Sequence, residues 1–261
     1  DYKMYKTNNK RLKISVITVT KNSEKFLKKN LSSVNSQSYK NYEHIIIDGK
    51  SSDKTLDIIK KNKKKIAYYE SQKDKGIYDA MNKGIKKCTG DIIGILNSDD
   101  YYYKDTLKIV NKYFNENKKI DFLFGSVFKH KLLSGFYPEK IFWTFGFYTS
   151  HSVGFFIRRK SQNKLGFYNL KYKYSSDYDL FYRMIVKKRF KGMATKQNEI
   201  FGVFRRGGIS SKLRYLDFII ENTKIRLDNG QNSLFVYLVF SIRFIKNLKK
   251  IVFEFFTKKK I

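Results

Sequence analysis

The stretch that decides the fold is Asp91-Ile92-Ile93-Gly94-Ile95-Leu96-Asn97-Ser98-Asp99-Asp100. Its apolar centre is rich in β-branched isoleucine, which is typical of a strand that is buried on both faces. Four polar residues follow at once, and they mark the point where such a strand leaves the core. Two adjacent carboxylates there are costly unless they face water or a cation. The alternative is a turn in which Asn and Asp cap the next helix, and these residues alone leave both interpretations open.

Strands and helices alternate on both sides of this stretch. The expected strands are residues 14–20, 44–47, 66–69, 91–96 and 122–127, and the expected helices are residues 24–34, 77–85 and 105–114, with a further helix after Ser52. This order predicts an α/β fold with a mainly parallel sheet flanked by helices. Because ligands bind at the carboxyl ends of parallel strands, Thr20, Asp48 and Asp99 are expected at one edge.

The composition allows one large domain and leaves the partners open. The chain has 261 residues, of which 41% are hydrophobic and one is proline. Its 55 Lys and Arg against 23 Asp and Glu give a net charge of +32, which attracts nucleic acid, anionic membranes or phosphorylated substrates. Lysine has AT-rich codons, so a bias in genome composition would supply the same lysines without selection for a binding partner. A nucleic-acid-binding protein remains the alternative, but the sequence has no RRM, KH or helix-turn-helix pattern, so no specific nucleic acid is expected.

The start of the chain and its cysteine content predict a cytoplasmic protein. Residues 1–11 are polar, and the apolar run at 14–19 is too short for a signal peptide. Cys88 is the single cysteine, which suits a reducing compartment. We interpret residues 1–12 as an N-terminal extension, whose first three residues before Met4 are an expression remnant.

The end of the chain predicts a basic amphipathic helix. Apolar residues recur at steps of three and four, and Arg243, Lys246, Lys249 and Lys250 fall mostly off that stripe. The stripe comprises Leu238, Ile242, Ile245, Leu248, Val252 and Phe255. Such a helix either packs on its own domain or lies on an anionic membrane, and we favour the membrane. The expected domains are therefore a main domain at 13–211, with a first half at 13–100 and a second half at 101–211, and a tail at 212–261.

Four ordered blocks within residues 13–100 resemble the family 2 glycosyltransferases with the GT-A fold. The blocks are residues 14–20, 43–55, 74–84 and 96–100. Their order and spacing are similar to those of a bacterial polysaccharide-assembly subgroup that includes colanic acid transferases. The resemblance implies inverting transfer from a nucleotide sugar, a UDP-sugar, to a saccharide acceptor, with a divalent cofactor, Mn²⁺ or Mg²⁺. It also implies that residues 13–211 are a catalytic domain, with its donor half at 13–100 and its acceptor half at 101–211. The basic amphipathic tail predicts an acceptor carried on a polyprenyl diphosphate, at the inner face of the cell membrane.

The resemblance also implies roles for residues of the donor half. Asp99 would bind the metal, with Asp100 second, while Asn97 stands where the family usually has Asp. Asp48 would accept a hydrogen bond from the base, and Ser52 would contact the ribose or diphosphate unless it only caps a helix. The remaining expected donor contacts are Thr18, Val19, Thr20, Lys75, Asp79, Asn82 and Ser98.

In the acceptor half, the block at residues 174–180 resembles the family's "ED" motif. Asp177 takes the place of the catalytic base, Ser176 stands where Glu is usual, and Asp179 is the competing carboxylate. The alternative for both carboxylates is a helix N-terminus, where Asp is favoured by the dipole. Outside this block, the acceptor contact is His151, which could equally be structural. Arg206 and Ser210 would contact the diphosphate or form a basic turn. Because of Asn97 and Ser176, a catalytically weak relative that only binds sugar nucleotides also stays open.

Overall fold

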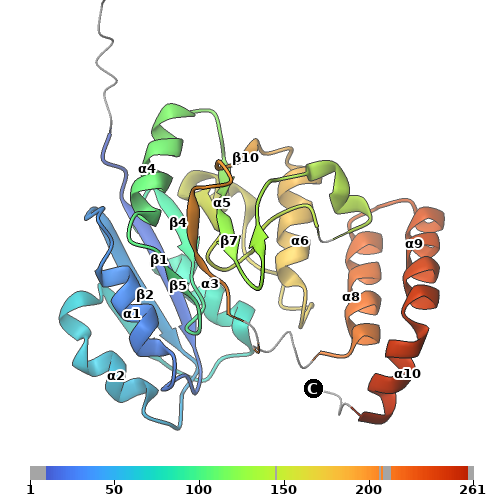
Figure 1. The fold of residues 1–261 in the computed structure, drawn as a ribbon, viewed down its shortest axis with the longest axis horizontal. Helices are drawn as coiled ribbons and strands as arrows, with labels where there is room; N and C mark the ends of the chain where they lie inside the picture. Colours follow the sequence, from blue (N-terminus) through green and yellow to red (C-terminus); the bar gives the residue numbers. More distant parts are fainter. Residues whose placement is uncertain (1–9, 145, 206, 208–212, 258–261) are drawn as a thin grey trace, which may run out of the picture.

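A seven-stranded sheet in the order β10-β6-β9-β4-β1-β2-β3 forms the centre of the computed structural model (Figure 1). The structure describes residues 10–144, 146–205, 207 and 213–257. Strands β1 (Ile14–Thr20), β2 (Tyr42–Asp48), β3 (Tyr68–Ser71) and β4 (Ile92–Ile95) run parallel. Strand β9 (Phe155–Arg158) pairs antiparallel with β4 and β6 (Phe122–Phe124), and β10 (Gly192–Ala194) is parallel to β6. The expected α/β fold with a mainly parallel sheet is confirmed.

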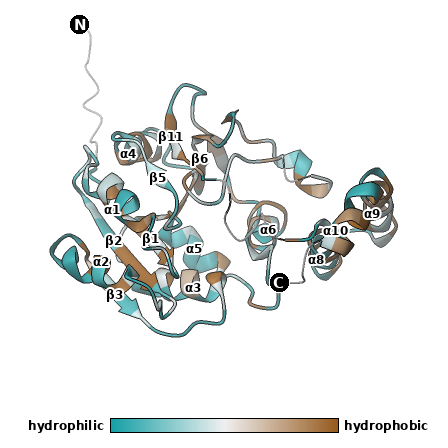
Figure 2. Ribbon diagram, turned by 60° about the horizontal axis from the view of Figure 1, so that its bottom comes forward, coloured by the Kyte–Doolittle hydropathy of each residue, from teal (hydrophilic) through white to brown (hydrophobic). Residues whose placement is uncertain are grey.

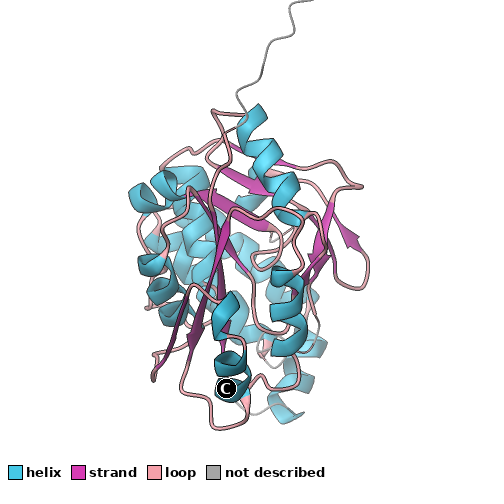
Figure 3. Cartoon of the chain, turned by 90° about the vertical axis from the view of Figure 1, so that its left-hand side faces the viewer, coloured by secondary structure: helices cyan, strands magenta, loops and turns pink. Residues whose placement is uncertain are grey.

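Both faces of the sheet are buried because alternate side chains of each strand meet different helices. Ile17 and Val19 of β1 join a core with α3 (Ile77–Lys87) and α6 (Ser176–Tyr182). Ile14 and Val16 point the other way, into a core with α4 (Thr106–Glu116). A smaller core joins β2 to α1 (Leu27–Asn35) and α2 (Thr55–Lys61). Figure 2 shows apolar residues along the central strands and hydrophilic residues on the helices around them, and Figure 3 shows the strands enclosed by helices.

The prediction of a single strand at residues 122–127 is wrong in one respect, because these residues form parts of two strands that belong to different sheets. Residues Ser126–Phe128 form β7, which joins β5 (Tyr101–Tyr102), β11 (Ile200–Val203) and β8 (Leu132–Leu133) in a second sheet. Gly125 makes the change of sheet possible, because a Cβ there would lie 2.1 Å from the Phe201 ring. Shorter elements are α5 (Arg159–Leu165) and the single turns η1 (Lys63–Lys65), η2 (Pro138–Phe142) and η3 (Arg183–Lys187).

The end of the chain forms three helices, and two of them replace the single amphipathic helix expected from residue 233 onward. Helix α8 (Tyr215–Asp228) packs against α6 and α9 (Ser233–Lys246), and α10 (Leu248–Thr257) contacts both α8 and α9. The expected continuous helix is therefore broken, and the break is at Asn247, whose amide donates back to the Arg243 carbonyl. Figure 1 shows this group on the side of the molecule away from β2 and β3. In the described part of the chain, no helix combines the length and apolar character needed to cross a membrane.

Candidate active site

A cleft of about 770 Å³ lies at the carboxyl ends of β1 and β4. Six segments form its walls: the end of β1 with the loop after it, the start of α3, the turn after β4, the segment before β9, the start of α6 and the segment after β11 (Ile200–Val203). Residues predicted as functional from both halves of the chain therefore meet there. Those that line the cleft are Val19, Thr20, Asn97, Ser98, Asp99, His151 and Asp177.

The end of β1 forms the wall predicted to receive the nucleobase. Val19 and Thr20 line the cleft, and the Thr20 hydroxyl is buried with no hydrogen-bond partner among the described residues. Thr18 lies deeper, where its hydroxyl is 2.9 Å from His44 Nε2. A ligand at this wall would therefore meet one polar group that the protein leaves unsatisfied.

Asp48 is fully buried beside this wall and is not among the lining residues. Its carboxylate accepts hydrogen bonds from the Ser51 hydroxyl at 2.5 Å, the Ser51 N–H at 3.0 Å and the Ser71 hydroxyl at 2.6 Å. Three of the roughly four acceptor positions of the carboxylate are thus used within the protein, and the role expected for Asp48 stays a prediction.

Four other expected donor contacts are not among the residues that line the cleft, namely Ser52, Lys75, Asp79 and Asn82. Ser52 does not cap α2, since the first free N–H of that helix, on Thr55, donates instead to Asp53. Asp79 accepts the Lys75 N–H at 3.0 Å. The Asn82 amide makes two 2.9 Å hydrogen bonds with the backbone of Tyr168. Helix α3 instead turns Tyr78 and Met81 toward the cleft.

The acidic turn after β4 divides its two carboxylates between the cleft and the interior. Asp99 lines the cleft, while Asp100 is 2% exposed. Asp100 accepts the Ser152 hydroxyl at 2.5 Å and the Arg205 N–H at 2.7 Å, so it ties the turn to two other segments. The Ser98 hydroxyl is 2.8 Å from that of Ser23 in the loop after β1.

Burial shapes the electrostatics of this turn. It raises the pKa of the Asp99 carboxyl, against the opposing effect of its own N–H and the Arg205 charge. Burial and the neighbouring Asp99 charge raise the pKa of Asp100 to about 7. A positive charge nearby would therefore stabilise the ionised form of both carboxyl groups.

The residues around Asp99 fit a cation that is shared with a phosphate ligand. In the segments that the structure describes, no three His, Cys, Asp or Glu side chains are grouped to hold a metal. Asn97 Oδ1 is buried and has no partner among those segments, so it adds a neutral oxygen beside the Asp99 carboxylate. Mg²⁺ and Mn²⁺ take oxygen ligands and are often held by one or two carboxylates together with substrate phosphates and water.

Asp177 reaches the cleft from the first turn of α6. Its Oδ1 accepts the Tyr178 N–H at 2.9 Å and lies 3.0 Å from the Tyr78 hydroxyl, which is also 2.9 Å from the Tyr174 carbonyl. Burial and the Asp177 charge raise the pKa of Tyr78 well above its ordinary value, so this hydroxyl stays a donor. Asp177 is therefore held in place by α3 while it remains open to a ligand.

The competing carboxylate, Asp179, is committed elsewhere. It is 3% exposed, forms a 2.8 Å ion pair with Arg183 Nε and accepts the Asn229 amide at 3.0 Å. The Ser176 hydroxyl donates to the Asn169 carbonyl and is fully buried. Of the two acidic residues in this block, Asp177 alone lines the cleft.

His151 stands at the cleft wall as a neutral imidazole. Burial lowers the pKa of His151, although the nearby Asp177 charge opposes the shift, and its Nε2 lies 2.6 Å from the Tyr168 hydroxyl. Two residues further on, Val153 has φ of 70°, a left-handed conformation that β-branched residues rarely adopt. Its N–H bonds the Ile95 carbonyl at the end of β4, which fixes this strained segment beside the acidic turn.

Sequence reasoning missed Arg205 and chose its neighbour. Arg206 and Ser210 lie outside the described residues, whereas Arg205 lines the cleft with its guanidinium 3.6 Å from the Phe26 ring centre. Phe26 and Tyr78 were also missed, because an aromatic residue near a helix start looks like a core residue in sequence. In the sequence, the pair Arg205-Arg206 indicated a basic residue here, but it did not distinguish which of the two lines the cleft.

Comparisons with known proteins agree with this arrangement. A family model described as glycosyl transferase family 2 matches residues 15–190. A PGL/p-HBAD biosynthesis glycosyltransferase of Mycobacterium bovis is 31% identical over 173 residues, which are 63% of this chain and 66% of that protein. A Methanococcus voltae transferase named for a dolichyl N-acetyl-alpha-D-glucosaminyl phosphate acceptor is 44% identical over 102 residues, which are 36% of this chain. The matched segment is 32% of that relative's length.

Solved structures share the fold. S. aureus TarS 1-349 in complex with UDP-GlcNAc has a TM-score of 0.65 at 19% identity, covering 88% of this chain and 70% of that one. The mannosyltransferase PcManGT from Pyrobaculum calidifontis, in complex with GDP-Man and Mn2+, has a TM-score of 0.66 at 15% identity, covering 89% and 69%. Identities this low show a common fold, while the finer likeness to colanic acid transferases stays a prediction.

Proposed function

The chain belongs to glycosyl transferase family 2, and from this premise we propose that it transfers a sugar from a UDP-sugar to a saccharide acceptor with inversion. One observation carries the proposal: a single carboxylate from each acidic motif, Asp99 and Asp177, lines the same cleft. Their sequence neighbours Asp100 and Asp179 are each satisfied inside the protein. Asp74 also lines the cleft, where its carboxylate accepts the Gly76 N–H, and the acidic motifs supply Asp99 from the donor half and Asp177 from the acceptor half.

On the donor side, the nucleotide would lie along the ends of β1 and β4. Its base would contact Val19 and Thr20, and its diphosphate would lie between Asp99 and the basic Arg205. A divalent cation, held by Asp99 with Asn97 as a neutral second ligand, would neutralise the charge of the diphosphate leaving group. The TarS and PcManGT complexes, which contain UDP-GlcNAc and GDP-Man with Mn2+, support a donor of this class.

On the acceptor side, Asp177 would act as the general base. The acceptor oxygen forms its bond to the anomeric carbon while the bond from that carbon to the diphosphate oxygen breaks, and the acceptor proton passes to Asp177. Attack on the face opposite the leaving group inverts the anomeric centre, with no covalent intermediate. Tyr78 and the Tyr178 N–H hold the carboxylate for this step.

We further propose that the acceptor is a lipid-linked saccharide, in bacterial surface polysaccharide or glycan synthesis. The printed name of the Methanococcus voltae relative specifies a dolichyl-phosphate-linked sugar, which supports a lipid-linked acceptor. The enzyme would then work in the cytoplasm at the inner face of the cell membrane.

The test is a panel of UDP-, GDP- and dTDP-sugars with Mn²⁺, scored by thermal shift and by donor hydrolysis. Asp177→Asn should abolish transfer and leave donor binding intact. Asp179→Asn is the matched control: it should lower the melting temperature, because Arg183 loses its partner, yet keep turnover per folded molecule. Loss of turnover in the control with retention in Asp177→Asn would reverse the assignment, and no response to any donor would refute the function.

A further inference from the structure

The outward faces of α9 and α10 are apolar, although no described segment of the chain packs over them. The six residues of the stripe predicted from sequence are between 44% and 71% exposed; we call them the apolar stripe: Leu238, Ile242, Ile245, Leu248, Val252 and Phe255. The inward contacts are made by other residues, among them Val236, Val239 and Ile251. A helix that used its apolar face to pack on its own domain would show the opposite pattern.

The apolar stripe has members on both sides of the break between the two helices. Ile245 near the end of α9 is 71% exposed, and Leu248 at the start of α10 is 46% exposed. Beyond the stripe, Leu234 at the start of α9 and Phe256 at the end of α10 are both 81% exposed. The exposed apolar residues are thus found on both helices, and they are more than a single isolated side chain.

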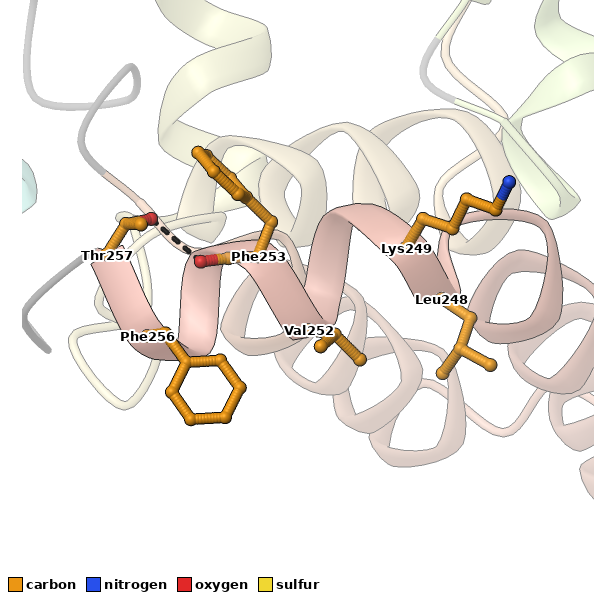
Figure 4. A pocket seen from close by; sticks show the side chains of 6 residues that line it. All are labelled: Leu248, Lys249, Val252, Phe253, Phe256 and Thr257. Atoms are coloured by element: carbon orange, nitrogen blue, oxygen red, sulfur yellow. Dashed lines mark hydrogen bonds between the residues drawn. The ribbon is translucent and has the colours of Figure 1, made fainter.

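Helix α10 also carries a shallow groove of about 560 Å³. Figure 4 shows Leu248, Val252 and Phe256 pointing to one side of the helix, with Lys249 on another side. The groove is lined almost wholly by apolar atoms, including the methylene stem that carries the Lys249 ammonium.

The charges beside this surface have one sign. Lys246, Lys249 and Lys250 are exposed. Residues 233–257 contain one acidic residue, Glu254, which is 4% exposed and accepts the Tyr215 N–H at 2.6 Å. Within the described part of α9 and α10, the charges that reach solvent are therefore positive.

We propose that the apolar stripe docks on an anionic lipid bilayer, with α9 and α10 lying along the surface. The apolar side chains enter the boundary between headgroups and acyl chains, and the three lysines contact lipid phosphates, each worth about 1 kcal/mol near such a surface. A second copy of the chain is a poorer occupant, because a symmetric contact would bring two sets of lysines together without exposed carboxylates. This inference does not depend on the transfer reaction.

The first experiment tests the apolar contact by flotation with phosphatidylcholine vesicles containing phosphatidylglycerol. The double variant Ile245→Asn, Phe256→Asn should lower the vesicle-bound to free ratio about tenfold or more, since losing each large apolar side chain from the interface removes more than 1 kcal/mol. Both positions are over 70% exposed, so folding should be unchanged. Leu170→Asn, at a 46% exposed leucine before α6, is the matched control and should bind like the parent.

The second experiment separates a specific basic rim from the general charge of +32. Replacing Lys246, Lys249 and Lys250 by Gln should weaken binding to anionic vesicles by up to about a hundredfold at low salt, by the same estimate per lysine. The control replaces three exposed lysines on η1, Lys63, Lys64 and Lys65, which carry the same charge far along the chain. Their loss should change binding much less.

Three outcomes would overturn the proposal. One is vesicle binding that is left unchanged by both the apolar double variant and the triple lysine variant. Another is equal loss from the η1 control, which would assign binding to bulk charge. The third is a dimer, seen by light scattering without lipid, that the double variant dissociates, since the stripe would then belong to a second copy. A thermal shift with the donor, unchanged in every variant, verifies that each is folded.

Discussion

Tyr78→Phe tests whether Asp177 is the base, because it removes one donor from that carboxylate and leaves the ring. The Tyr78 hydroxyl lies 3.0 Å from Asp177 Oδ1, and its ring stacks on Tyr168 with centres 5.5 Å apart. The phenylalanine should keep that stack. What changes is one of the hydrogen bonds that hold the Asp177 carboxylate in its position for proton abstraction.

The magnitude follows from the contacts that remain. A hydrogen bond to a charged group contributes about 1.5–3 kcal/mol. The Tyr178 N–H still donates, and the buried Tyr148 also faces this carboxylate, since burial and Asp177 together raise the pKa of its hydroxyl. The lower end of the range therefore applies, and about 1.4 kcal/mol corresponds to a tenfold change in rate. We expect kcat/KM for transfer to fall by about tenfold.

The assay is kcat/KM for transfer with saturating donor and metal, beside donor binding followed by thermal shift. The variant should lose about tenfold in kcat/KM, while donor binding should stay within a few-fold of the parent. Tyr39→Phe is the control, because it removes a buried hydroxyl that donates to Leu12 at 2.7 Å at the other end of β1. If kcat/KM does not fall, or falls equally in the control, the Tyr78 contact does not position the base.

Three further predictions follow from the same contacts. Asp99→Asn should remove the Mn²⁺ dependence of donor binding in calorimetry, whereas Asp100→Asn should keep it, because Asp100 bonds Ser152 and the Arg205 backbone. Burial opposes ionisation of Glu43, but hydrogen bonds from Lys13, Ser15 and Thr89 lower its pKa to about 2. A carboxyl group whose pKa is lowered by folding stabilises the protein above its ordinary pKa, and this contribution is lost as pH falls toward the lowered pKa. About 3 kcal/mol of the free energy of unfolding should therefore disappear as pH falls from roughly 5 to 2. In urea titrations, the free energy of unfolding of Glu43→Gln should depend less steeply on pH. Gly94→Ala should lower the free energy of unfolding by about 1–3 kcal/mol, because its Cβ would lie 2.3 Å from the Phe156 ring in β9.

The order of elements and the edge that carries the cleft could be predicted because they depend on local pattern. Apolar runs that end in Thr20, Asp48 and Asp99 indicate where buried strands finish, and the parallel pairing of β1 with β2 and β4 brings those ends together. The sequence could not say which polar side chains at that edge are already satisfied. Asp48 is held by Ser51 and Ser71, and the second of these is 23 positions away.

The same limit applies to the helices around the cleft. The spacing of Asp79 and Asn82 places them near each other on α3, but the face that meets the cleft is set by packing on the sheet, which selects Tyr78 and Met81. The split of residues 122–127 between two sheets depends on contact with Phe201, more than seventy positions away, and no local pattern encodes it.

The C-terminal helices do more than add a surface, because α8 braces the chain on both sides of Asp177. Glu221 accepts the Tyr174 N–H at 2.8 Å, Arg226 Nε lies 2.7 Å from the Tyr178 hydroxyl, and Asn229 donates to Asp179 at 3.0 Å.

Arg226 is 2% exposed, so its burial is tolerable only while this contact to α6 holds. The helix that positions the proposed base is therefore packed against the group that carries the apolar stripe. If that stripe rests on a bilayer, the bilayer has a fixed orientation relative to Asp177, and an acceptor anchored in the same bilayer meets the base from a defined side.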